Sequence, residues 1–276
     1  MDTYCVMGNP VEHSKSPWIH ARFAALTGQT LQYGRRLIPL DGFEAGLSAF
    51  MAEGGKGCNI TVPFKFQAAG LVRHASARAQ LAQACNTLRF EDDGIHADNT
   101  DGVGLVNDIT RNAGVPLAGR DVLLIGAGGA AAGVLGPLIE AGAKRIVIAN
   151  RTTDKAAALA ARHAVLALRH GTELLACGLQ NTQSAFDIII NGTASSLNGG
   201  EVPVPASVLK PGALAYDMMY GPAANGFMDW ARAHGAVGRD GLGMLVEQAA
   251  ESFVFWRGVR PPSAQVLAEL RATLAA

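Results

Sequence analysis

A glycine-rich turn near the middle of the chain most constrains the fold. The apolar run Val122–Ile125 leads into Gly126-Ala-Gly-Gly-Ala130, and an alanine-rich helix is expected to follow. Gly126 permits a tight turn, Gly128 lets the backbone approach a pyrophosphate, and the free N–H groups of a helix start favour an anion. A bare glycine pattern also fits an ordinary strand-to-helix turn. The second apolar strand, Arg145–Ala149, makes a dinucleotide-binding unit the better interpretation.

The position of this turn predicts a second domain. More than a hundred of the 276 residues precede it, and strands alternate with helices in that stretch. A helix is expected over Gly102–Asn112 to link the two domains. Further strands are expected at Tyr4–Met7, Leu31–Ile38, Cys58–Thr61, Thr87–Phe90, Ile95–Ala97, Asp187–Asn191 and Ala213–Asp217. After Asp240 two helices are expected with no strand between them, so we expect them to return to the first domain. The predicted fold is α/β with two domains. Residues 1–101 and 242–276 form a discontinuous α/β substrate domain, and residues 102–241 form a Rossmann-like dinucleotide-binding domain.

Composition narrows the possible partners. Hydrophobic residues make up 49% of the chain and charged residues 17%, which is typical of a compact globular protein. The 23 basic residues balance the 23 acidic ones, so no net field attracts nucleic acid or an anionic membrane. The chain shows neither a signal peptide nor an apolar run long enough to span a bilayer. Its four scattered cysteines indicate reduced thiols, and we expect a cytoplasmic monomer or homodimer that binds a small-molecule substrate.

Four polar segments of the first domain could carry chemistry, and each also has an ordinary structural interpretation. Ser14 and Ser16 precede a helix, where Ser16 would be the N-cap and Pro17 the first helical residue. Lys65 follows a short strand and could be a solvated surface charge. The other two segments, Asn86-Thr87 and Asp98–Gly102, could be a turn and a capping cluster.

Taken together, these segments resemble the shikimate dehydrogenase family almost from end to end. The blocks that carry the resemblance follow one another in the family's order: Gly8–Pro17, Asn59–Lys65, Asn86–Leu88, Asp98–Gly102, Gly126–Ala130, Asn150–Thr152, Tyr216–Tyr220 and Asp240–Ala250. The combination is far more specific than any single motif.

The resemblance implies an oxidoreductase of aromatic amino acid biosynthesis that reversibly reduces 3-dehydroshikimate to shikimate with NADPH. Lys65 and Asp101 would be the catalytic pair, because a lysine beside a carboxylate can stabilise a developing oxyanion and pass a proton. The sequence does not say which of the two is the formal acid–base group, since such pairs titrate jointly. The residues implied for substrate binding are Ser14, Ser16 and Tyr220 at the carboxylate, and Thr61, Asn86 and Gln248 at the ring hydroxyls or the carboxylate.

The expected cofactor is NADP. An acidic residue roughly 20 residues after the glycine turn normally binds the ribose 2′-hydroxyl of NAD. Here the second strand ends in Asn150-Arg-Thr152, where Arg151 can pair with a 2′-phosphate and its neighbours can add hydrogen bonds. An exposed arginine at a strand end is the alternative. The full set implied for the cofactor is Gly126, Ala127, Gly128, Gly129, Ala130, Asn150, Arg151, Thr152, Met218 and Gly241, the last two at the nicotinamide end by family resemblance.

Some positions depart from the family pattern. Cys85 stands before Asn86 where a valine is usual, Ala77 replaces a frequent carboxylate, and the loop Asn191–Ser196 is slightly unusual. Two alternatives stay open: a broader quinate/shikimate or aminoshikimate dehydrogenase, and a non-catalytic NADP-binding paralogue. The histidines suggest no metal site by their spacing; they are His13, His20, His74, His96, His163, His170 and His234.

Overall fold

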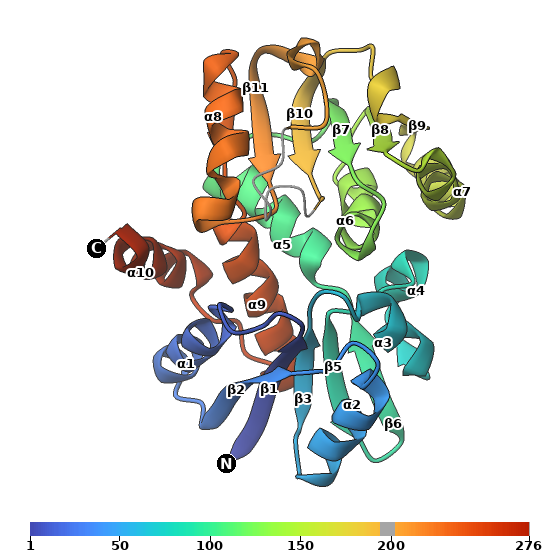
Figure 1. Cartoon of the computed structure of the whole chain (residues 1–276). Helices are drawn as coiled ribbons and strands as arrows, with labels where there is room; N and C mark the ends of the chain where they lie inside the picture. The colour runs from blue at the N-terminus through green and yellow to red at the C-terminus, as the bar shows by residue number, and fades with distance from the viewer. Residues whose placement is uncertain (194–201, 276) are drawn as a thin grey trace. The chain divides into compact units, whose positions relative to one another are not determined.

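The chain forms two compact α/β units, as the sequence predicted (Figure 1). The structure is a computed structural model, and it describes residues 1–193 and 202–275. Unit 1 comprises Met1–Gly104 and Leu245–Ala276, and unit 2 comprises Leu105–Met244. The loop Asn191–Ser196, singled out in the sequence, lies partly outside the described residues.

Unit 1 is built on a mixed six-stranded sheet. Its strand order is β2-β1-β3-β5-β6-β4, with bounds Leu31–Leu37, Asp2–Gly8, Gly57–Ile60, Thr87–Glu91, Gly94–Asp98 and His74–Ala75. β1 pairs in parallel with β2 and β3, whereas β5 runs antiparallel to both β3 and β6. The sequence predicted every strand except the two-residue β4, which is too short to show an alternating pattern.

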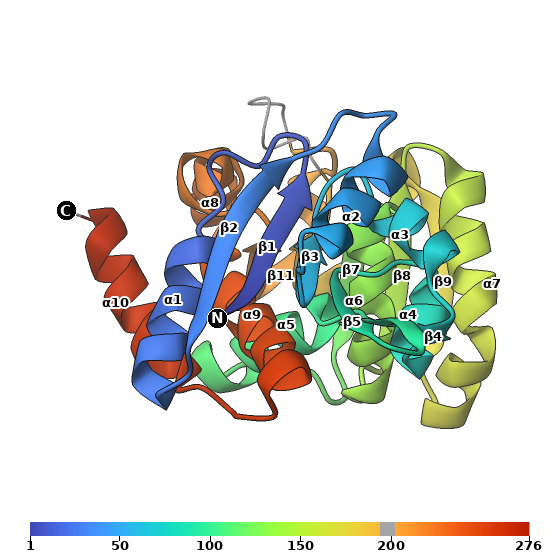
Figure 2. The same ribbon diagram turned by 90° about the horizontal axis from the view of Figure 1, so that it is seen from below.

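Helices cover both faces of this sheet, as Figure 2 shows. On one face, α2 (Phe43–Ala52), α3 (Lys65–Leu71) and α4 (Ala77–Ala82) pack on the apolar side chains of β1, β3 and β5. On the other face lie α1 (Ser16–Thr27), α9 (Leu242–Arg257) and α10 (Ser263–Ala275).

Aromatic rings fill the space under α1 and α9. The His20 ring stacks on Tyr33 with 4.3 Å between ring centroids, and Phe23 meets Phe253 edge to face. Burial lowers the pKa of His20 to about 3. His20 is therefore neutral at physiological pH and packs as an aromatic side chain.

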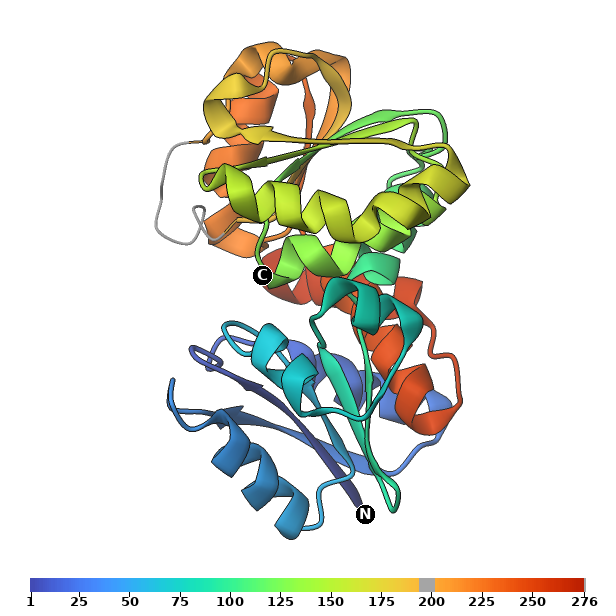
Figure 3. The same cartoon turned by 90° about the vertical axis from the view of Figure 1, so that its right-hand side faces the viewer.

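Unit 2 is a doubly wound parallel sheet (Figure 3). Its strand order is β9-β8-β7-β10-β11-β12, with bounds Glu173–Gly178, Arg145–Asn150, Asp121–Ile125, Phe186–Asn191, Leu209–Asp217 and Val237–Arg239. The chain starts in the middle at β7 and winds outward in both directions, so the strand order reverses between β7 and β10. A reversal of this kind is where open α/β sheets bind their ligands.

This winding determines which face of the unit 2 sheet each helix covers. α6 (Gly129–Glu140) and α7 (Thr153–His170) connect β7, β8 and β9, and right-handed crossovers place them on one face. α8 (Asn225–Ala233) connects β11 to β12, and its Phe227 and Ala231 pack on the other face. The sequence missed β9 and β12. β9 is a partly exposed edge strand, and β12 has only three residues.

One predicted helix is divided in the structure. The sequence favoured a continuous helix over Gly102–Asn112, but α5 (Asp101–Asn107) ends at Asn107 and a π-helical turn covers Asp108–Asn112. The Asp108 carboxylate is fully buried and accepts hydrogen bonds from Arg239 and Tyr216. These partners fix Asp108 at the point where the helix changes its pitch.

None of the helices in the described part of the chain has the length and apolar character needed to cross a membrane.

The close packing of β3 gives a prediction about stability. A methyl group at Gly57 would lie 2.5 Å from the Leu88 carbonyl oxygen and 2.8 Å from Trp256 Nε1, which itself donates to that oxygen. Gly57→Ala should therefore lower the free energy of unfolding by about 1–3 kcal/mol, measured by urea denaturation. Gly34→Ala is the control, because no atom in the described part of the chain lies within 4 Å of a carbon added at that strand glycine. Equal stability of the two variants would contradict this packing argument.

Candidate functional site

The topology of unit 1 brings the four polar segments to one edge of its sheet. β1, β3 and β6 run in one direction, so the loops that follow them leave at the same edge. β5 runs the opposite way, so Asn86 and Thr87 lie where that strand begins, at this same edge. The carboxyl ends of parallel strands are the usual place for ligand groups in α/β proteins.

An ion pair between Lys65 and Asp101 lies at the centre of this edge. Lys65 is the first residue of α3, and Asp101 is the first residue of α5 (Asp101–Asn107). Lys65 Nζ donates to Asp101 Oδ2 at 2.5 Å. The side chains are only 14% and 7% exposed, so water screens the pair little. A buried, hydrogen-bonded ammonium beside a carboxylate can hold or move a proton.

The Asn86 side chain holds Asp101 in place. Its Nδ2 donates to Asp101 Oδ1 at 2.9 Å, and its Oδ1 accepts from the Thr100 backbone N–H at 2.8 Å. Nδ2 also lies 3.2 Å from Gln248 Oε1. Asn86 is 2% exposed, so these partners compensate for its burial. Three predicted substrate or catalytic residues, Asn86, Asp101 and Gln248, are thus joined directly.

Sequence reasoning missed two residues that extend this network. Thr100 accepts from Asn86 Nδ2 at 2.9 Å. Ser252 accepts from Asn59 Nδ2 at 2.9 Å and lies 2.8 Å from the Thr87 hydroxyl. Ser252 follows Gln248 by four residues, and therefore lies on the same face of α9. That spacing was the only available signal, and it is too common to be used alone.

A second ion pair supports the segment before Asp101. The Asp98 carboxylate accepts from Arg78 Nε at 2.7 Å and Ser76 Oγ at 2.6 Å, and also from the Asn99 backbone N–H. Burial would raise the pKa of Asp98, but the hydrogen bonds and charge of Arg78, with the other two donors, hold this pKa below its ordinary value. Asp98 therefore stays ionised and anchors the chain three residues before Asp101.

Ser14 and Ser16 lie in the loop that joins β1 to α1. Ser14 Oγ accepts from the Ser16 backbone N–H at 3.3 Å, and Arg35 donates to the Ser14 carbonyl oxygen at 2.6 Å. The prediction that Ser16 is the helix N-cap is wrong. The N-cap is Lys15, whose carbonyl accepts from the Ile19 N–H and whose backbone angles are already helical. α1 therefore begins at Ser16, one residue before the predicted Pro17.

Thr61 lies next to this loop. Its backbone N–H donates to the Met7 carbonyl, and a methyl group added at Gly8 would overlap the Thr61 side chain. Gly8 therefore allows the ends of β1 and β3 to approach closely. The serine loop and the segment that leads to Lys65 are neighbours for this reason.

Unit 2 carries the glycine-rich turn between β7 and α6. Gly126 adopts φ = +109°, a conformation that favours glycine, and its N–H donates to the Ala149 carbonyl. Gly128 precedes the first residue of α6, and no atom of the described residues lies within 4 Å of an added Cβ position there. The turn formed by residues 126–130 thus offers open space at a helix N-terminus, which is where a pyrophosphate can bind.

The end of β8 carries the segment predicted to select the cofactor. Asn150 is its last residue, and Arg151 and Thr152 follow as exposed side chains. Asn150 Nδ2 donates to the Thr152 carbonyl oxygen at 2.9 Å, which fixes the start of α7. No carboxylate occurs among these three residues, so the observed strand end still lacks the acid expected for NAD.

Met218 and Gly241 lie together after β11 and β12. The Met218 backbone N–H donates to the Asn191 carbonyl, which places it at the end of β10. A methyl group at Gly241 would lie 2.3 Å from the Met218 carbonyl oxygen, so only glycine allows this approach. Tyr220 follows two residues after Met218, at the start of a short 3₁₀ turn.

Comparison with known proteins identifies the family. Three family models match the chain: a shikimate dehydrogenase substrate binding domain over residues 6–88, a shikimate/quinate 5-dehydrogenase domain over 108–198, and a shikimate 5′-dehydrogenase C-terminal domain over 241–271. A protein named shikimate dehydrogenase (NADP(+)) from Acidovorax sp. (strain JS42) is 69% identical over 275 residues, covering 100% of this chain and 98% of that protein. The chain belongs to the shikimate dehydrogenase family.

Other relatives agree with this family. The shikimate dehydrogenase (NADP(+)) of Dechloromonas aromatica is 52% identical over 276 residues, covering 100% of this chain and 99% of the relative. The Ael1 enzyme from Pseudomonas putida has a TM-score of 0.87 at 47% identity, with 98% of both chains covered. Shikimate 5-dehydrogenase from Thermus thermophilus, solved with NADP(H) and shikimate, has a TM-score of 0.82 at 28% identity, with 99% of both covered. The predictions of the family, of its oxidoreductase activity and of NADP as cofactor are confirmed.

The Asp98 contacts predict a pH dependence of stability. Because the pKa of Asp98 is lower in the folded than in the unfolded chain, its contribution is fully present above the unfolded value of about 3.9. This contribution is lost as the pH falls through the lower folded value. Asp98→Asn should cost roughly 1–3 kcal/mol of unfolding free energy at pH 7, and this difference should shrink below pH 4. Urea denaturation from pH 3 to 7 measures it.

The exposed Asp41 provides the control. Asp41→Asn should leave the unfolding free energy within about 0.5 kcal/mol of the wild-type value throughout this pH range. An Asp98→Asn variant as stable as wild type at pH 7 would show that the Arg78 contact does not anchor the segment.

Proposed function

We propose that this chain catalyses the reversible NADPH-dependent reduction of 3-dehydroshikimate to shikimate, within aromatic amino acid biosynthesis, with Lys65 and Asp101 as its proton-transfer pair. The observation that carries the residue assignment is the buried 2.5 Å contact between Lys65 Nζ and Asp101 Oδ2. A protein that only binds a dinucleotide has no use for such a pair.

The pair acts on the oxygen of the ring carbonyl. In the direction of reduction, negative charge develops on that oxygen, and the Lys65 ammonium stabilises it and donates a proton. Asp101 orients the ammonium, and Asn86 in turn fixes the carboxylate. In the direction of oxidation, the pair accepts the proton of the hydroxyl. Lys65 and Asp101 exchange protons as one coupled unit.

The proposed substrate contacts of unit 1 come from the same edge of its sheet. Ser14 and Ser16 offer hydroxyl groups at the start of α1, where helix N–H groups favour a carboxylate. Tyr220 is assigned to the substrate carboxylate by the family pattern alone. Thr61, Asn86 and Gln248 are assigned to the ring hydroxyls or the carboxylate, as the family pattern implies. Asn86 and Gln248 are already held within the Asp101 network.

The residues of unit 2 fit NADP. Open space at Gly128, the left-handed turn at Gly126 and the start of α6 fit a pyrophosphate. Exposed Arg151, with Asn150 and Thr152 beside it, suits a 2′-phosphate. Met218 and Gly241 are assigned to the nicotinamide end. When bound, the cofactor supplies the hydride that the side chains of this protein cannot provide.

A broader quinate/shikimate dehydrogenase is the second candidate function. The family model that matches residues 108–198 is named for both shikimate and quinate. Quinate has an extra hydroxyl on the carbon that bears its carboxylate, and it lacks the adjacent double bond, so its carboxylate leaves the ring at a different angle. Two serines fixed at the start of α1 would tolerate that change poorly.

The proposed location is the cytoplasm, where the protein would act as a monomer or a homodimer. All four cysteines are free thiols. Burial raises the pKa of Cys5 and of Cys85 to about 12, so neither forms a reactive thiolate at neutral pH. Free, unreactive thiols suit a reducing compartment.

A substrate comparison tests the proposed function. Absorbance of NADPH is followed with shikimate and then with quinate, each with NADP. The account predicts turnover of shikimate with a kcat/KM about tenfold or more above that for quinate. Comparable values would make the broader enzyme the better assignment, and no turnover of either acid would favour a non-catalytic paralogue.

Substitution of the catalytic pair tests the residue assignment. Lys65→Ala and Asp101→Asn should each lower kcat by roughly 100- to 10,000-fold, the usual contribution of a positioned acid–base group. KM for shikimate should change far less for Lys65→Ala, because the proposed carboxylate contacts lie elsewhere. The exposed Lys56 provides the control, since Lys56→Ala should keep wild-type kcat. Near-normal turnover of either pair variant would show that the assignment is wrong.

Loss of Arg151 tests the cofactor assignment. Arg151→Ala should weaken NADPH binding by about 1.5–3 kcal/mol, or roughly ten- to a hundredfold, and should leave NADH binding nearly unchanged. Calorimetric titration with each cofactor measures both values. Arg169→Ala, an exposed arginine at the far end of α7, is the matched control. Equal losses for the two cofactors would place the 2′-phosphate elsewhere.

A further inference from the structure

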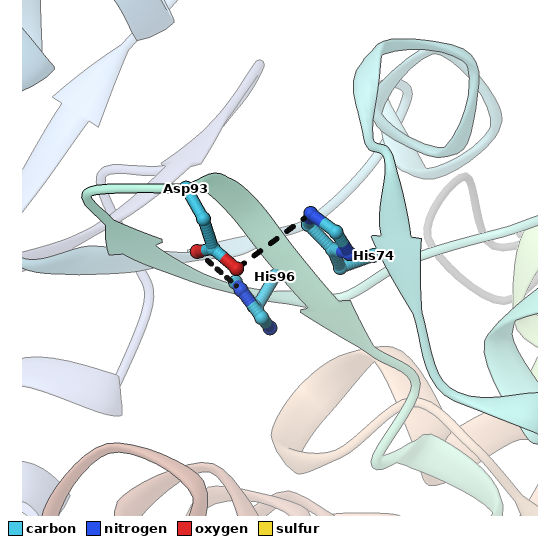
Figure 4. Close-up of side chains that lie close together, drawn as sticks. All are labelled: His74, Asp93 and His96. Atoms are coloured by element: carbon cyan, nitrogen blue, oxygen red, sulfur yellow. Dashed lines mark hydrogen bonds and ion pairs between the residues drawn. The ribbon is translucent and has the colours of Figure 1, made fainter.

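Two histidines and an aspartate gather at the outer edge of the unit 1 sheet, on the strands β4 and β6 and the turn before β6 (Figure 4). They are His74, Asp93 and His96. His74 is the first residue of the edge strand β4, and Asp93 lies in the turn between β5 and β6. None of the three belongs to the proposed catalytic or cofactor machinery.

The donor atoms of these side chains converge. His96 Nε2 lies 2.8 Å from Asp93 Oδ1, and His74 Nε2 lies 3.8 Å from Asp93 Oδ2. One potential ligand atom from each residue can be chosen so that all three lie within 4.8 Å of one another. In Figure 4 the carboxylate faces both imidazole rings.

The backbone fixes this arrangement. His74 and His96 are direct partners in the parallel β4–β6 ladder, so their side chains leave the sheet on the same face. Their rings stack with 4.6 Å between centroids and 19° between planes. Asp93 belongs to the two-residue turn of the β5–β6 hairpin, whose last pair is Glu91 with Gly94. Strand pairing therefore brings the three side chains together without a ligand.

This donor set matches transition-metal chemistry. Neutral imidazole suits Zn²⁺, Cu²⁺ and Ni²⁺, and a carboxylate provides an anionic ligand. Metal–ligand distances of about 2.0–2.2 Å place tetrahedral ligand atoms about 3.3–3.6 Å apart. The longer separations, of up to 4.8 Å, would have to contract, and the 2.8 Å contact between His96 Nε2 and Asp93 Oδ1 would have to open, as the ion replaces that hydrogen bond. The His74 and Asp93 side chains are 44% and 62% exposed, so they are free to make this adjustment.

We propose that His74, Asp93 and His96 bind one divalent transition-metal ion of the Zn²⁺ type, in an open site where water completes the coordination. The ion would connect the edge strand β4 and the β5–β6 hairpin. β4 has only two residues, and Ser76, which follows it, donates to Asp98. The ion would therefore stabilise the edge of the sheet that supports Asp98 through Ser76.

Local sequence patterns do not reveal this site. His74 and His96 are separated by 22 positions, and Asp93 lies three residues before His96, which is no recognised ligand spacing. The two histidines meet only because β4 pairs with β6, and β4 itself was not predicted. This proposal replaces the expectation from the sequence that the histidines form no metal site.

Direct titration tests the proposal. Protein without an affinity tag is stripped with a chelator and titrated with Zn²⁺ in a calorimeter, and separately with Co²⁺ in a spectrophotometer. We expect one ion per chain and a rise in the thermal unfolding midpoint with Zn²⁺. His74→Ala, His96→Ala and Asp93→Asn should each weaken binding about tenfold or more, since even supporting residues of metal sites contribute that much.

Two controls separate this site from other donors. His170→Ala removes an exposed histidine at the end of α7, and Cys177→Ser removes the least buried cysteine; both variants should bind as wild type does. The Co²⁺ complex should show d–d absorption without a thiolate charge-transfer band. The proposal is overturned if the His74→Ala/His96→Ala double variant binds Zn²⁺ as tightly as wild type, if wild type binds none, or if a thiolate band appears.

Discussion

The ion pair between Lys65 and Asp101 is the interaction around which the candidate site of unit 1 is arranged. Removing an ammonium and a carboxylate from water costs several kcal/mol per ion, and their attraction compensates only when geometry and additional hydrogen bonds are good. Asn86 supplies such a bond to Asp101, and Thr100 fixes Asn86. The polar residues around the pair are therefore needed to hold both charges in a largely shielded site, where they act more strongly on a developing oxyanion than in bulk water.

The mixed strand directions of unit 1 explain how distant segments supply this site. Lys65 follows β3, Asn86 precedes β5 and Asp101 follows β6. Because β5 reverses direction between β3 and β6, all three positions come to one edge. α9 then brings Gln248 from the far end of the chain to the same network. In unit 2 the strands are parallel, so β7 and β8 end at the same edge of the sheet. The glycine turn follows β7, and Arg151 follows β8.

The sequence predicted those features that local patterns encode. The apolar strand before Gly126, the glycine turn and the helix after it follow from residue type and spacing, and the structure has them at those positions. The pairing of Lys65 with Asp101 came only from the family motifs, since residues 36 positions apart carry no local signal. Thr100, Ser252 and the short strand β4 were missed because tertiary contacts define them. The His74–Asp93–His96 cluster depends on β4 and was hidden for the same reason.

A double-mutant cycle tests the central claim most directly. kcat/KM for shikimate is measured in wild type, Lys65→Ala, Asp101→Asn and the double variant, with circular dichroism to verify the fold. Residues that act as one unit are strongly non-additive, so the double variant should lose little more activity than the worse single variant. Losses that multiply would show that Lys65 and Asp101 act independently, and would contradict the account of a coupled proton-transfer pair.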